Sequence, residues 1–82
     1  MEKVIIKGAG KYANGVLTII TVDTLYDINL VTGEYGYRTI GDYWHFGGKV
    51  TTSELARLRE ECDKYYEFNL ITFEILERRV LK

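Results

Sequence analysis

Proline is absent from the 82-residue chain, and cysteine, histidine, serine, methionine and tryptophan each occur once. The lack of proline excludes polyproline ligands and proline-rich linkers. Cys62 alone cannot form an internal disulfide, on which small secreted domains commonly depend, so we expect a cytoplasmic protein. The apolar block Val4–Ile6 is shorter than the roughly 7–15 residues of a signal-peptide core, and no run approaches the ~20 apolar residues of a membrane-spanning helix.

Side chains with catalytic or metal-binding chemistry are scarce. Ser53 is expected in the first turn of a helix, where a hydroxyl usually caps backbone N–H groups, and Cys62 lies on an apolar stripe. His45 has Asp42 nearby as a partner for general-base chemistry, although a lone histidine is more commonly a surface or packing residue. One His and one Cys cannot supply a structural zinc site. We therefore predict no enzymatic activity, no cofactor and no metal.

Charge is almost balanced, with 11 Lys and Arg against 12 Asp and Glu and a net charge of −1. This balance disfavours a protein whose main partner is a nucleic-acid backbone or an anionic membrane. Because 82 residues suffice for only one hydrophobic core, we expect residues 1–82 to form a single domain.

Short β-branched and aromatic segments separated by turn residues predict an antiparallel meander. Asn14-Gly15 before a β-branched run indicates a two-residue hairpin between the first two strands, with Gly8 or Gly10 available for a bulge. The strands are predicted at Val4–Lys7, Val16–Val22, Leu25–Val31, Tyr35–Ile40 and Tyr43–Phe46.

After residue 50 the spacing of the apolar residues changes to that of an amphipathic helix. Thr51 and Glu54 match a capping box, and Val50 and Leu55 match a hydrophobic staple. The apolar stripe of the helix consists of Leu55, Leu58, Cys62, Tyr65 and Tyr66, and we expect the helix to end near Phe68 or Asn69. Alternation returns from Leu70. The predicted fold is α+β: a meander of four to five strands packed on one amphipathic helix, with a C-terminal strand that rejoins the sheet.

The segment Gly8-Ala9-Gly10-Lys11-Tyr12-Ala13 matches the GxGxxA form of the dinucleotide-binding fingerprint. A hairpin and a strand follow it instead of the helix that would hold a pyrophosphate, so we reject a Rossmann fold. A weaker alternative is a small nucleotide-sequestering protein, in which a flexible loop of Lys7, Gly8, Gly10 and Lys11 contacts a phosphate.

Residues 35–46 hold the densest aromatic cluster, with Tyr35, Tyr37, Tyr43, Trp44 and Phe46 among twelve residues. Alternation places Tyr35 and Tyr37 on one face of the sheet and Arg38 on the other, and it places Trp44 and Phe46 opposite Tyr43 and His45. Either Trp44 and Phe46 close the core beneath the helix, or some of these rings stay exposed and bind a partner.

From this cluster we predict a non-catalytic protein-protein interaction domain, with the oligomeric state open and a homodimer among the options. One form would be an anti-CRISPR-like inhibitor, encoded by a phage or mobile element, of a host defence or nucleic-acid enzyme, in which helix carboxylates mimic phosphates. The alternative is an OB-like single-stranded nucleic-acid binder, since Tyr35-Gly36-Tyr37 is a fragment of an aromatic RNA-binding motif. The predicted partner-binding residues are Tyr35, Tyr37, Arg38, Tyr43, Trp44, His45, Glu60, Glu61, Asp63 and Glu67.

Overall fold

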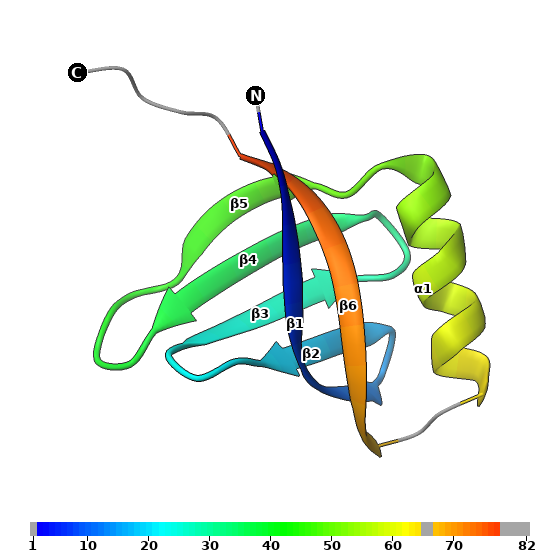
Figure 1. Ribbon diagram of the computed structural model, residues 1–82, viewed down its shortest axis with the longest axis horizontal. Coiled ribbons are helices and arrows are strands. Elements are labelled where there is room, and N and C mark those ends of the chain that lie inside the picture. Colours follow the sequence, from blue (N-terminus) through cyan, green and yellow to red (C-terminus); the bar gives the residue numbers. More distant parts are fainter. Residues whose placement is uncertain (1, 65–66, 78–82) are drawn as a thin grey trace.

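The computed structural model describes residues 2–64 and 67–77, with side chains described for residues 3–62 and 70–75 (Figure 1). All strand pairs are antiparallel, and the strands form one sheet in the order β5-β4-β3-β2-β1-β6. The predicted α+β fold is confirmed: a five-stranded meander, one helix and a C-terminal strand. The elements are β1 (Glu2–Ala13), β2 (Val16–Ile20), β3 (Thr24–Asn29), β4 (Glu34–Thr39), β5 (His45–Lys49), α1 (Thr52–Lys64) and β6 (Glu67–Glu77).

The hairpin between β1 and β2 forms where the sequence predicts it. Ala13 pairs with Val16, which leaves Asn14 and Gly15 as a two-residue turn. Both residues have positive φ, 53° and 79°, which the type I′ turn requires and which asparagine and glycine tolerate better than other residues. This turn starts the meander.

Strand β1 is longer than the predicted Val4–Lys7, and the glycine segment that follows is part of the strand, not a flexible loop. Gly8 and Gly10 are buried where β2 and β6 approach β1 from its two sides. A Cβ on Gly8 would lie 2.5 Å from the carbonyl oxygen of Ile20, and one on Gly10 would overlap the side chain of Ile71. The glycines therefore allow close packing, and the predicted bulge occurs in the β1–β6 pairing between Gly10 and Lys11.

The sheet curls so that β1 and β6 run across the direction of β3, β4 and β5 (Figure 1). Phe73 of β6 is fully buried, and its ring centroid lies 5.5 Å from that of Tyr26 and 6.4 Å from that of Tyr35. These edge-to-face contacts join the last strand to the middle of the meander. The buried core consists of Leu17, Ile19, Ile28, Leu30, Tyr35, Val50, Leu58, Cys62, Ile71, Phe73 and Ile75.

Helix α1 begins as predicted and ends earlier than predicted. The Thr51 hydroxyl accepts a hydrogen bond from the Glu54 N–H at 3.2 Å, as an N-cap does. The helix ends at Lys64 instead of continuing to Phe68 or Asn69, because residues from Glu67 onward pair with β1 as β6. Tyr65 and Tyr66, which we assigned to the apolar stripe, lie outside the described residues.

Charged side chains of α1 fasten the helix to the sheet. Arg57 donates a hydrogen bond to the carbonyl oxygen of Thr72, and the Glu54 carboxylate accepts one from the Glu74 N–H at 3.3 Å. Arg59 donates to the carbonyl oxygens of Leu30 and Val31, at 2.7 and 3.1 Å. One end of the sheet is therefore covered by the helix, while the β2–β3 and β4–β5 connections lie at the opposite end (Figure 1).

Candidate interaction surface

The aromatic segment is divided between the two faces of the sheet, which we call the inner face, toward Phe73 and α1, and the outer face. Tyr35 and Tyr37 of β4 belong to the inner face and Arg38 to the outer face, as alternation predicts. Tyr35 is only 5% exposed, because Gly47 of β5 has no side chain and leaves the space that the ring occupies. The prediction that Tyr35 belongs to a contact surface is therefore wrong.

Trp44 and Phe46 are on the outer face, so of the two alternatives left open by the sequence, the one in which they close the core is wrong. They are 49% and 71% exposed. Phe46 pairs with Gly36 of β4, and the Trp44 ring lies 3.6 Å from the position that a Gly36 Cβ would take. The core beneath β5 is already filled by Tyr35, which leaves no inner position for either ring.

A row of apolar residues crosses the outer face over four neighbouring strands and reaches Arg38 on a fifth, and we call it the outer row. Each residue pairs with the next in the register of the sheet. At one end the Arg38 guanidinium lies 5.6 Å from the centre of the Trp44 ring, within the range of a cation–π interaction. Ile20, Leu70 and Trp44 are each about half exposed or more. The outer row is Leu70, Ala9, Ile20, Leu25 and Arg38, followed by Trp44.

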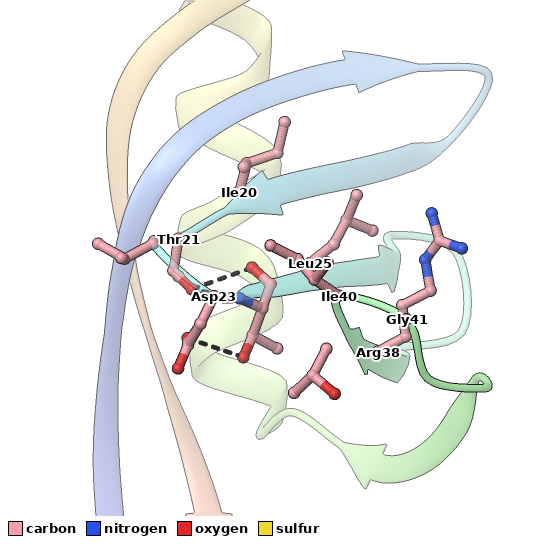
Figure 2. Close-up of a pocket in the computed structure, with 10 residues that line it drawn as sticks. Ile20, Thr21, Asp23, Leu25, Arg38, Ile40 and Gly41 are labelled. Carbon is pink, nitrogen blue, oxygen red and sulfur yellow. Dashed lines mark hydrogen bonds between the residues drawn. The ribbon is translucent and has the colours of Figure 1, made fainter.

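A groove lies beside the outer row, between the β2–β3 turn and the β4–β5 connection (Figure 2). We call it the turn groove; its volume is about 310 Å³. Figure 2 shows the side chains of Ile20, Leu25 and Arg38 extending to the same side of three adjacent strands. Hydrogen bonds among Thr21, Asp23 and Thr24 fix the shape of the β2–β3 turn. The lining residues are Ile20, Thr21, Val22, Asp23, Thr24, Leu25, Arg38, Thr39, Ile40 and Gly41.

The β4–β5 connection carries an exposed histidine–carboxylate pair. His45 Nε2 lies 3.2 Å from Asp42 Oδ2, and the His45 ring stacks on Tyr37 with centroids 5.4 Å apart. The Tyr43 N–H donates to Asp42 Oδ1 at 2.7 Å, and this bond, followed by the interaction with His45, lowers the pKa of the Asp42 carboxyl from its usual value. Tyr43 itself is 85% exposed. Ser53 lies in the first turn of α1, with its hydroxyl 3.3 Å from that of Thr51, and Cys62 is buried in the core.

The acidic residues of the predicted surface lie on a different part of the molecule. Glu60 is exposed on α1, and Glu61 is half-buried with its carboxylate 2.9 Å from Arg57 Nη1. The side chains of Asp63 and Glu67 lie outside the described ones. Because α1 and the β4–β5 connection are at opposite ends of the molecule, the acidic and aromatic residues do not form one continuous site (Figure 1).

The proposed phosphate loop does not exist as a loop. Lys7 and Lys11 are exposed on the outer face of β1, while Gly8 and Gly10 are buried in the strand between them. In the described part of the chain, no group of three or more His, Cys, Asp and Glu side chains is placed to hold a metal ion. Of the helices described, none has the length and apolar character needed to cross a bilayer.

The sequence interpretation missed the aliphatic part of the outer face. Ile20 and Leu25 looked like ordinary strand residues, and only their cross-strand register places them in line with Arg38, while Ile40 lines the same groove. Comparison of the chain with protein-family models, curated proteins and solved structures gives no match. Function is therefore inferred from the surface itself.

Proposed function

We propose that the protein is a non-catalytic domain that binds another protein through Trp44, Phe46 and Arg38 on the outer face of its sheet, together with exposed Tyr43 in the adjoining β4–β5 connection. The observation that carries this proposal is the exposure of these three rings, which is 49–85% although the core of the same sheet is well filled. Large apolar side chains that are exposed side by side mark interaction sites more often than isolated ones do. Trp, Tyr and Arg also dominate binding hot spots.

The shape of the surface suits a protein partner. Phe46 and Trp44 provide rigid apolar area, the turn groove provides a concavity for a protruding side chain, and Arg38 and Tyr43 provide polar groups at the rim. Interfaces combine these three features: an apolar centre, a polar rim and complementary shape. The inner-face pair of Tyr37 and His45 adjoins this area across β4 and β5.

Two narrower alternatives differ in the partner. An inhibitor of a host defence or nucleic-acid enzyme would bind that enzyme in the cytoplasm; of its acidic residues whose side chains are described, Glu60 is exposed and Glu61 is paired with Arg57. A single-stranded nucleic-acid binder would stack bases on Trp44 and Phe46. The second alternative is weaker, because Asp23 and Asp27 share the outer face with Arg38 and the chain is net acidic. The open meander also differs from the five-stranded Greek-key barrel of OB-folds.

An affinity capture experiment tests the proposal. The wild-type protein and the double variant Tyr43→Ala, Phe46→Ala are immobilised and exposed to a lysate of the source cells, and bound proteins are quantified by mass spectrometry. Both side chains are mostly exposed, so we expect the variant to fold normally and to lose the partner that the wild type retains. Tyr12→Ala, which removes an exposed ring from β1, is the control and should retain it. Equal capture by the double variant would refute the assignment of the surface.

A further inference from the structure

Arg38 differs from the other two arginines whose side chains are described. Arg57 is bound to Glu54, Glu61 and the Thr72 carbonyl, and Arg59 is bound to two carbonyl oxygens. Within the described residues, no carboxylate or carbonyl oxygen accepts a hydrogen bond from Arg38. Its guanidinium lies instead against the ring of Trp44. A guanidinium that lies against an aromatic ring keeps its N–H donors free, and these donors match a carboxylate in bidentate geometry.

The free guanidinium is placed next to an apolar concavity. Arg38, Ile20 and Leu25 extend to the same side of three adjacent strands and border the turn groove, together with exposed Val22 and Ile40 (Figure 2). A ligand that satisfies both features carries a carboxylate within one residue of a large apolar side chain. Its carboxylate would face Arg38, and its apolar group would lie over Ile20 and Leu25.

We propose that the turn groove and the Arg38–Trp44 pair bind an acidic–apolar segment of a partner polypeptide, with one carboxylate on Arg38 and the neighbouring aliphatic side chain in the groove. This inference rests on the proposed protein-binding function and names the chemistry that the surface recognises. A polypeptide is favoured over nucleic acid because Arg38 is the one cationic residue among those that line the groove, and Asp23 also lines it, which suits one carboxylate better than a run of phosphates.

A pair of matched peptides tests the recognition directly. N-acetyl-Leu-Asp-Leu amide and N-acetyl-Leu-Asn-Leu amide differ only in the carboxylate, and Trp44 is the sole tryptophan, so its fluorescence reports on the site. We expect the Asp peptide to change the Trp44 emission saturably, with a Kd of roughly 1–10 mM. The Asn peptide should bind about tenfold more weakly, because it lacks the charge-assisted hydrogen bonds.

Three variants separate specific recognition from net charge. Arg38→Gln should weaken binding of the Asp peptide about tenfold, and Arg38→Lys should weaken it to an intermediate extent because the ammonium group lacks the planar fork. Lys3→Gln removes the same charge from an exposed position near the far end of β1 and should leave binding unchanged. Circular dichroism of all three variants should match the wild type, since these side chains are exposed.

Four other outcomes of these binding experiments would contradict the proposed recognition of an acidic–apolar segment. Equal binding of the Asp and Asn peptides, or an equal loss in Lys3→Gln and Arg38→Gln, would show that Arg38 does not recognise a carboxylate. No fluorescence change up to about 20 mM of either peptide would show that the groove does not take such a segment. Tight, salt-dependent binding of a ten-nucleotide oligothymidylate instead would identify the ligand as nucleic acid. Failure of the peptides with continued, Phe46-dependent capture of a protein would reject this inference and leave the proposed function standing.

Discussion

The two faces of the sheet both carry large apolar side chains, and they differ in what covers them. The inner face is closed by α1 and by β6, whose Phe73 contacts Tyr26 and Tyr35. The outer face also carries an apolar row, yet no described element of the chain lies over Trp44 or Phe46. The comparison shows that aromatic content alone does not identify core residues, because what decides is which face another element covers.

The largest effect should come from truncating equivalent rings on the two faces. Phe73→Ala should lower the free energy of unfolding by about 3–5 kcal/mol, because it removes a fully buried ring and leaves a cavity. Phe46→Ala should change it by no more than about 0.5 kcal/mol. Urea denaturation followed by circular dichroism measures both values. Similar losses for the two variants would show that Phe46 is part of the folded core.

A smaller effect is expected where β1 passes closely between its neighbours. Gly8→Ala should cost about 1–3 kcal/mol, because the new methyl group would meet the backbone carbonyl of Ile20, which cannot move without disturbing the pairing of β1 and β2. Lys7→Ala, at the adjacent outward position, is the control and should be nearly neutral. The same denaturation assay applies, and a neutral Gly8→Ala would contradict the close packing on the inner face.

The covering helix depends on its N-cap. Thr51→Ala should destabilise the protein by about 1 kcal/mol, since the Glu54 N–H loses its hydrogen-bond acceptor. Thr52→Ala makes the same threonine-to-alanine substitution at the first residue of the helix. It leaves the Thr51 cap in place and should have little effect. Thermal unfolding of both variants distinguishes the two positions; a loss of equal size at residue 52 would mean that the cap is not responsible.

The smallest predicted effect is a pH dependence in the exposed β4–β5 connection. The Asp42 carboxyl titrates below its usual pKa, so its interactions with the Tyr43 N–H and His45 are fully present above the ordinary aspartate pKa and are lost as the pH falls through the lowered value. In NMR titrations, His45→Ala should raise the midpoint of Asp42 toward the ordinary value without restoring it fully, because the Tyr43 N–H remains. An unchanged midpoint would exclude a contribution from His45.

Local sequence signals predicted the fold well. The Asn14-Gly15 turn and the Thr51 cap depend on residues within four positions of each other, so their chemistry is readable directly from the sequence. The length of β1 was underestimated because the glycines read as a loop, whereas β2 and β6 pair with that segment from both sides. The end of α1 was misplaced for the same reason: pairing with a distant strand overrode the local helical pattern.

The candidate surface was only partly predictable. The aromatic density of residues 35–46 and the outward direction of Arg38 follow from the sequence and from strand alternation. The sequence does not predict that Tyr35 is buried and Phe46 exposed. This outcome depends on the space that Gly47 leaves for the Tyr35 ring and on the register shift between β4 and β5 at Tyr35 and Gly36. The aliphatic residues of the outer row become neighbours only through the pairing of four strands.

Site-specific photo-crosslinking tests whether the outer face of the sheet is the surface that contacts a partner protein. Benzoylphenylalanine is introduced at position 46 on the outer face or at position 12 in β1, both exposed aromatic positions, and irradiated in cells or lysate. We expect position 46 to crosslink to a specific protein and position 12 not to do so. Absence of any specific crosslink at position 46, with a partner captured through position 12 or another part of the chain, would show that the outer face of the sheet is not the binding surface.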